Sequence, residues 1–214
     1  MTGLVRKATL LTAAGLFIAS VAMAGVPSPT NSTVPAYIKA VGAKTGVADP
    51  HGTFSIVVRD LANNPINGAS VVIDLSGTTD LRLCNDQLDA GATVNCAGKT
   101  TRKFTDVTGT VTFTVLGGGK GAGTATTLHG GGKVFANGTQ IGTPTITAVD
   151  LDGVGGVGIN DLSVWLGDFG TSGNPAFGRS DFDQNGSVGI NDLSVWLTFF
   201  GQSSSLSSCS VNCN

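Results

Sequence analysis

The sequence predicts a mainly β fold, in which a β-sandwich is followed by a small module with two helices. Glycine is abundant, with 32 of 214 residues, and every acidic residue is an aspartate, so strong helix formers are few. Short apolar segments alternate with turn sequences between residues 36 and 149. The ten-residue segment VGINDLSVWL occurs twice, at 157–166 and at 188–197, which indicates duplication of one structural unit.

The N-terminus has the order of a secretory signal. Arg6 and Lys7 precede the apolar stretch 8–21, and Ala-Met-Ala at 22–24 fits the small-residue pattern of a cleavage site. We therefore expect residues 1–24 to be removed and the protein to be secreted or held at the cell surface. The alternative is an uncleaved membrane anchor, but the stretch is shorter than the about 20 apolar residues that a spanning helix needs. No membrane span is expected after signal removal.

The next part of the chain is predicted to be a linker followed by the sandwich. Residues 25–35 are rich in proline, serine and threonine, which is typical of a linker. VVRDLANNPINGASVVIDLSG at 57–77 places a turn between two apolar strands, and TDVTGTVTFTV at 105–115 contains a turn followed by period-two alternation. These segments resemble bacterial immunoglobulin-like domains of secreted proteins. The resemblance implies an Ig-like β-sandwich over 36–149.

Four cysteines in an exported chain favour disulfides. Three pairings are possible for four cysteines. Proximity in the sequence favours Cys84 with Cys96, and Cys209 with Cys213, the second pair lying in a serine-rich tail at 202–214. The alternative, a four-cysteine zinc site, lacks the paired C-x-x-C motifs that such sites use.

An acidic loop precedes each copy of the repeated segment. Residues 181–192 follow the twelve-residue EF-hand-like calcium pattern, with oxygen ligands at positions 1, 3, 5, 7 and 12 and glycine at position 6. Hard oxygen ligands favour Ca²⁺ over zinc or copper. An aspartate- and glycine-rich turn without metal is the alternative. The predicted ligands in this second loop are Asp181, Asp183, Asn185, the Ser187 carbonyl and Asp192.

The first loop, residues 150–161, matches the calcium pattern less completely. Val154 occupies position 5, and valine cannot coordinate a cation. We therefore expect the second loop to bind calcium more tightly, and occupancy of the first loop stays open. The predicted ligands in the first loop are Asp150, Asp152, the Gly156 carbonyl and Asp161.

A short helix is predicted after each loop. Apolar residues recur at i, i+3, i+4 and i+7, which predicts one apolar face on each helix, packed inside the module. Gly170 and Gly201 are expected to end the helices. The predicted buried faces are Leu162, Trp165, Leu166 and Phe169 in the first helix, and Leu193, Trp196, Leu197 and Phe200 in the second.

A loop followed by a single helix, duplicated, with aspartate at position 12, resembles a type I dockerin over residues 150–201. The resemblance implies a calcium-folded module that docks secreted proteins onto cohesin domains, often in assemblies that degrade polysaccharides. Both predicted helices lack lysine and arginine, unlike many cohesin-binding dockerins. The partner contacts that the resemblance implies are Ile159, Asn160 and Ser163, and Ile190, Asn191 and Ser194.

Catalysis is not predicted. His51 and His129 are isolated in the sequence, and no Gly-x-Ser-x-Gly motif occurs. A net charge of −2 without a basic patch argues against a nucleic-acid partner. We expect a secreted, non-catalytic, calcium-binding protein whose dockerin-like end docks to a cohesin-like or other surface protein. One alternative is an adhesin or a carbohydrate-binding Ig-like protein, with a polysaccharide as partner and the dockerin-like end as a calcium-stabilised cap. Another is an enzyme whose active site lies in the sandwich.

Overall fold

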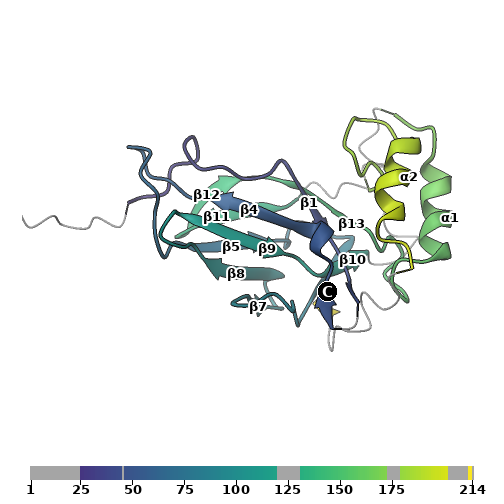
Figure 1. The fold of residues 1–214 in the computed structure, drawn as a ribbon, viewed down its shortest axis with the longest axis horizontal. Coiled ribbons are helices and arrows are strands. Elements are labelled where there is room, and N and C mark those ends of the chain that lie inside the picture. The colour runs from purple at the N-terminus through teal and green to yellow at the C-terminus, as the bar shows by residue number, and fades with distance from the viewer. Residues whose placement is uncertain (1–24, 45, 120–130, 173–178, 202–211, 214) are drawn as a thin grey trace, which may run out of the picture.

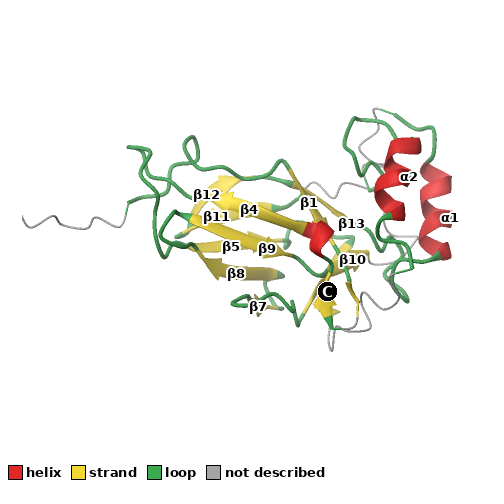
Figure 2. Ribbon diagram, in the orientation of Figure 1, coloured by secondary structure: helices red, strands yellow, loops and turns green. Residues whose placement is uncertain are grey.

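Most of the chain forms a β-rich body, and two helices lie side by side at one end of it (Figures 1 and 2). The computed structural model describes residues 25–44, 46–119, 131–172, 179–201 and 212–213. The predicted signal at 1–24 lies outside the described residues. The mainly β prediction is confirmed. Within the described part, neither helix is long and apolar enough to cross a membrane.

We call the strands together the β body, and residues 150–201 the helical module. The first half of the β body contains β1 (Tyr37–Ala40), β2 (Ala43–Lys44), β3 (Val47–Ala48), the 3-10 turn η1 (Pro50–Gly52), β4 (Thr53–Val57), β5 (Ser70–Asp74) and β6 (Leu81–Cys84). The second half contains β7 (Thr93–Asn95), β8 (Thr100–Phe104), β9 (Thr110–Thr114), β10 (Gly117–Gly119), β11 (Lys133–Ala136), β12 (Thr139–Gly142) and β13 (Thr145–Ala148). The helical module contains α1 (Ile159–Asp168) and α2 (Ile190–Leu197), and the chain then returns to the β body as β14 (Asn212–Cys213).

The strands pair mostly in antiparallel order. The largest sheet has the order β12-β11-β5-β8-β7, and β4 pairs with β9 in a separate ladder. β10, β6 and β14 form a third sheet, in which β6 is central. β1 and β13 pair in parallel, so the first strand lies beside the last strand before the helical module. This pairing places the start of the helical module at a fixed end of the β body.

The largest apolar cluster of the described residues lies inside the β body. Alternation along the strands turns every second side chain inward, as with Val71 and Ile73 of β5 and Val111 and Phe113 of β9. These side chains pack in one cluster with residues of β1, β4, β6, β11 and β13. Each such burial stabilises the fold by about 1.5–3 kcal/mol relative to an exposed side chain. The period-two part of 105–115 is thus β9, a strand with one buried face that follows a turn.

The segment expected to be a linker is packed against the β body. Ser28 is buried, and its backbone N–H donates to the Arg59 carbonyl at 2.8 Å. Thr33 and Val57 exchange two backbone hydrogen bonds, of 2.8 and 3.0 Å, and Val34 packs against the core. The composition of 25–35 is that of a turn-rich segment, but its backbone groups find partners at the end of β4. The linker prediction is therefore corrected.

The predicted cysteine pairing is wrong. Cys96 is bonded to Cys213, with the two Cα atoms 4.7 Å apart, so the pairs Cys84–Cys96 and Cys209–Cys213 do not form. Cys84 is also disulfide-bonded, whereas Cys209 lies outside the described residues. Cys213 is not paired with its neighbour in the sequence because the chain end returns to the β body. There β14 pairs with β6, which places Cys213 opposite Leu83. Proximity in the sequence does not reveal such a contact between distant segments.

We expect non-reducing peptide mapping to recover Cys96 joined to Cys213. The bond joins residues 117 positions apart. Closing a loop of about 100 residues stabilises a fold by about 4.7 kcal/mol in the entropy model, which is an upper limit here because Cys84 already supplies a second crosslink. The double substitution Cys96→Ser/Cys213→Ser should therefore lower the unfolding free energy measured by urea denaturation. Recovery of a Cys84–Cys96 peptide would contradict this pairing.

Candidate metal centre

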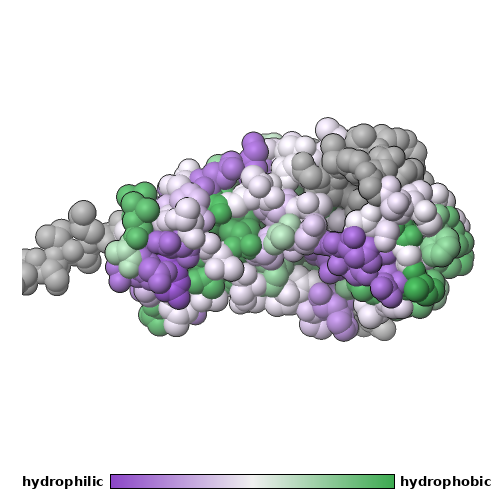
Figure 3. Space-filling view, turned by 90° about the horizontal axis from the view of Figure 1, so that it is seen from above, coloured by the Kyte–Doolittle hydropathy of each residue, from purple (hydrophilic) through white to green (hydrophobic). Residues whose placement is uncertain are grey.

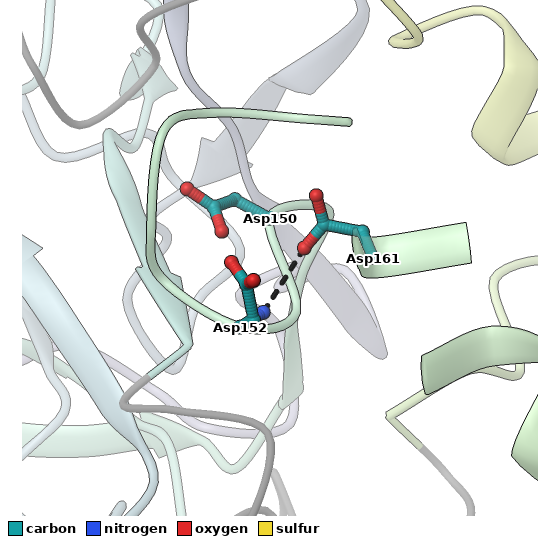
Figure 4. Close-up of side chains that lie close together, drawn as sticks. All are labelled: Asp150, Asp152 and Asp161. Carbon is teal, nitrogen blue, oxygen red and sulfur yellow. Dashed lines mark hydrogen bonds between the residues drawn. The ribbon is translucent and has the colours of Figure 1, made fainter. Parts of the chain in front are cut away.

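Two groups of three aspartates lie in the helical module. In the first loop, carboxylate oxygens of Asp150, Asp152 and Asp161 all lie within 4.8 Å of one another. Figure 4 shows these three carboxylates directed toward a common space, with Asp161 at the start of α1. The second loop repeats the group with Asp181, Asp183 and Asp192. The structure therefore brings together all six predicted carboxylate ligands, three in each loop.

The first aspartate of each loop makes the same turn. Asp150 Oδ1 accepts from the Gly153 N–H at 2.6 Å, and Asp181 Oδ1 accepts from the Gln184 N–H at 2.6 Å. Gly153 and Gln184 both have left-handed backbone, with φ of 71° and 66°. A non-glycine residue seldom adopts this conformation, so the loop geometry imposes it on Gln184.

The last aspartate of each loop joins the loop to its helix. Asp161 Oδ1 accepts from Leu151 N–H at 2.6 Å and Asp152 N–H at 3.0 Å, while Oδ2 accepts from Gly158 N–H at 2.7 Å. In the second loop, Asp192 accepts from the backbone N–H groups at the equivalent places, Asp183 at 2.9 Å and Gly189 at 2.7 Å. Each carboxylate also lies in the first turn of its helix, where the helix dipole favours negative charge.

Three other predicted ligand positions differ from the simple expectation. Asn185 directs its amide nitrogen to Asp183 Oδ2 at 2.9 Å, and its oxygen accepts from the Ser187 N–H at 2.9 Å and hydroxyl at 2.6 Å. Coordination by Asn185 therefore requires that its oxygen lose at least the hydrogen bond from the Ser187 hydroxyl. Gly156 has φ of 88°, whereas Ser187 at the same loop position is not left-handed, so the two backbones diverge at position 7. Val154 is exposed, and its side chain offers no ligand.

The two loops differ in burial. Asp150 is fully buried and Asp152 is 9% exposed, whereas Asp181 is half-buried and Asp183 is exposed. Burial, followed by the charge of Asp152, raises the pKa of Asp161, although hydrogen bonds from three backbone N–H groups oppose the rise. Burial also raises the pKa of Asp181, with the charges of Asp192 and Asp183 acting in the same direction. Such clustered, desolvated oxygens fit a hard cation such as Ca²⁺.

The predicted buried faces of the two helices are partly wrong. Trp165 and Trp196 are buried, but Leu166, Phe169, Leu197 and Phe200 are exposed by about half, at 58%, 52%, 53% and 47%. The buried side of α1 runs through Asp161, Trp165 and Asp168, and that of α2 through Asp192 and Trp196, followed by the buried Phe199 two residues after the helix. The loop aspartate must point inward, and this fixes the rotation of each helix. The position-12 aspartates Asp161 and Asp192 are visible in the sequence, but a prediction from apolar periodicity alone does not take their inward direction into account.

Six large apolar side chains in or shortly after the two helices are exposed, and we call them together the apolar helix surface. The six residues that the dockerin resemblance implied as contacts are exposed or nearly so, with Ile159 and Ile190 each 66% exposed. Gly170 N–H bonds the Val188 carbonyl at 2.9 Å and Gly201 N–H bonds the Val157 carbonyl at 3.3 Å, so the end of each helix meets the start of the other repeat. Figure 3 shows hydrophobic side chains at this end of the molecule. The surface consists of Ile159, Leu166, Phe169, Ile190, Leu197 and Phe200.

The repeats are joined by a buried ion pair. Asp168, at the end of α1, is 1% exposed and accepts from Arg179 Nε at 2.7 Å and a second guanidinium nitrogen at 3.0 Å. Ser180 adds a hydroxyl hydrogen bond of 2.6 Å to the same carboxylate. Phe199, two residues after α2, stands at the matching place in the second repeat and contacts the His51 ring of the β body. His51 is thus part of the junction, and His129 lies outside the described residues.

Comparison of the chain with protein-family models, with curated proteins and with solved structures finds no match. The function must therefore be argued from the two acidic loops and the exposed surface beside them.

In the metal-free protein, the contribution of Asp161 and Asp181 to stability should fall as the pH rises. This direction is opposite to that of Asp60 and Asp106, whose pKa values are lowered by hydrogen bonds. The raised pKa values of Asp161 and Asp181 mean that folding favours their protonated forms. Their stabilising contribution is fully present below the usual aspartate value of 3.8 and is lost as the pH rises through the raised values. Thermal unfolding of metal-free protein between about pH 4 and pH 7 measures this loss. Asp161→Asn should show a smaller loss, and an equal or larger loss in that variant would contradict the assignment.

Proposed function

We propose that this protein is a secreted, non-catalytic calcium-binding protein in which an Ig-like β-sandwich carries a dockerin-like module that docks to another protein. The observation that carries the proposal is the recurrence of the same hydrogen bonds at the first and last aspartates of both loops. Three hydrogen bonds at the first and last aspartates recur at the same positions, with lengths that agree within 0.1 Å: 2.6 and 2.6 Å, 3.0 and 2.9 Å, and 2.7 and 2.7 Å. Two loops that keep this geometry and these carboxylates share one ligand chemistry.

The energetics of the aspartate groups support calcium as that ligand. Three carboxylates within 4.8 Å repel one another, and burial raises the cost of their charge. A divalent cation offsets both effects, so its binding free energy becomes folding free energy of the module. Carboxylate and backbone oxygens are the donors that Ca²⁺ prefers, and the twelve-residue spacing supplies them.

The apolar helix surface supports docking to a protein partner. Soluble proteins rarely expose large contiguous apolar patches, and those that do often use them as interaction sites. Leucine, isoleucine and phenylalanine side chains occur here at equivalent places in both repeats. Asn160, Ser163, Asn191 and Ser194 are exposed beside them and supply uncharged hydrogen-bonding groups. A partner with an apolar, weakly charged face, such as a cohesin-like domain, fits this surface.

Calorimetric titration of the full chain with Ca²⁺ should give two binding sites. Asp152→Asn and Asp183→Asn remove one carboxylate each from equivalent places in the two loops, so each variant should lose one site and keep the other. Val154→Asp adds the missing position-5 ligand and should raise the affinity of the first loop, by about tenfold for 1.4 kcal/mol of added binding free energy. Absence of any calcium binding would refute the proposed function.

Docking should depend on calcium and on the apolar helix surface. The immobilised full chain, incubated with the secreted proteins of the source organism, should retain a partner in Ca²⁺ and release it in chelator. The double substitution Leu166→Glu/Leu197→Glu places a charge on each helix and should abolish retention of the partner, because the apolar contact is then lost on both helices.

The matched control is Leu61→Glu, which changes an 80% exposed leucine on the β body. This variant should retain the same partner with unchanged affinity. Equal retention by the Leu166→Glu/Leu197→Glu variant would argue against docking through the helices.

A further inference from the structure

The backbone of the first loop is hydrogen-bonded to the β body, whereas the second loop meets the β body through the side chains of Phe182 and Val188, in an apolar cluster shared with Val41 and Val149. Asp150 follows β13 after a single residue, Val149. The N–H of Gly119 in β10 donates to the Asp150 carbonyl at 2.7 Å. A Cβ atom at position 119 would lie 2.1 Å from the Leu151 carbonyl oxygen, so only glycine permits this approach. Asp183 and Asn185 of the second loop are, by contrast, exposed.

The same short piece of backbone is held from two sides. The carbonyl groups of Asp150 and Leu151 face Gly119 of the β body. The N–H groups of Leu151 and Asp152 donate to Asp161 on α1. Residues 150–152 therefore connect the last carboxylate of the first loop to β10, and any change in how that carboxylate is held reaches the β body within a few bonds.

The rest of the junction is apolar and shared. Val41 and Val149 of the β body pack in one cluster with Trp165, Trp196 and Phe199 of the helical module. Trp196 Nε1 donates to the Val149 carbonyl at 3.2 Å, one residue before the first loop. The helical module thus has no complete core of its own, because its core continues into the β body.

The neighbouring strands extend this junction to the chain end. Gly119 of β10 pairs with Leu81 of β6, and β6 pairs with β14 on its other side. Cys213 of β14 is bonded to Cys96. The helical module is consequently attached to the β body at its start, through the first loop, and after its end, through β14.

We propose that calcium in the first loop latches the helical module onto the β body through the backbone contact at Gly119, while calcium in the second loop acts on the β body through the shared apolar core. The inference rests on the calcium binding of the proposed function and adds that the two loops have different structural roles. The latch sets the orientation of the apolar helix surface relative to the β body. By thermodynamic linkage, calcium in the first loop strengthens the contact at Gly119, and that contact strengthens calcium binding by the same factor.

Hydrogen exchange of the full chain, with and without Ca²⁺, tests the latch. The amide of Gly119 and the amides of residues 151–152 report the junction, and those of 183–189 report the second loop. Asp161→Asn and Asp192→Asn form a matched pair, because both replace the last aspartate of a loop and the first-turn carboxylate of a helix. We expect Asp161→Asn to lose the calcium-dependent protection at Gly119, and Asp192→Asn to keep it.

Gly119→Ala tests the reverse direction and does not alter any loop ligand. The added methyl group must displace the Leu151 carbonyl, so calcium affinity of the first loop should fall by about tenfold, within the usual range of coupling between sites. Calcium affinity of the second loop should stay unchanged, as measured by calorimetry. This variant decides the question if Asp161→Asn does not fold.

Three outcomes would overturn the latch. In the first, the Gly119 amide of the unmodified chain is equally protected with and without calcium. In the second, Asp161→Asn and Asp192→Asn have equal effects on that amide, and in the third, Gly119→Ala leaves the calcium affinity of the first loop unchanged. Each can occur while residues 183–189 still gain protection from calcium, in which case the proposed function stands. Loss of calcium-dependent protection at every position, with no calcium binding by calorimetry, would overturn both.

Discussion

The helical module depends on one interaction that occurs twice, the buried carboxylate that ends each acidic loop. Asp161 and Asp192 are both fully buried, and each accepts hydrogen bonds from the start of its loop and from the residue before its helix. Because this carboxylate must face inward, the tryptophan four residues later is also buried. The apolar residues on the opposite side, such as Leu166 and Leu197, are left in solvent. The exposed surface is therefore a consequence of how the loop is closed.

Burying this carboxylate beside two others has an electrostatic cost in free energy, and the module is also small. Clustered carboxylates are costly to bury, and the calcium that we propose would offset that cost. A unit of about 50 residues also buries too little apolar surface to be comfortably stable alone. Here the β body supplies Val41 and Val149 to the core around the two tryptophans. If the module binds calcium as we propose, its stability is shared between a cation and a neighbouring sheet, and its core depends on the β body.

The topology reinforces this dependence. The chain leaves the β body after β13, forms the two loops and helices, and returns as β14 beside β6. The Cys96–Cys213 disulfide then joins positions 117 residues apart. An Asp168–Arg179 ion pair, buried at 1% exposure on the aspartate side, holds the two repeats together between these attachments. A module attached at both ends has a restricted orientation, unlike one carried on a flexible linker.

The sequence by itself determined the features that arise from local patterns. Period-two alternation identified β9, and the duplicated segment with its spaced aspartates identified two loop–helix units and six carboxylates that meet in space. The tertiary structure alone decided the partner of Cys96, the packing of residues 25–35 and the burial of the first loop against Gly119. Each of these depends on contacts between distant segments, and no periodicity encodes them. The rotation of the helices lies between the two, because it follows from a local carboxylate whose inward direction only the closed loop enforces.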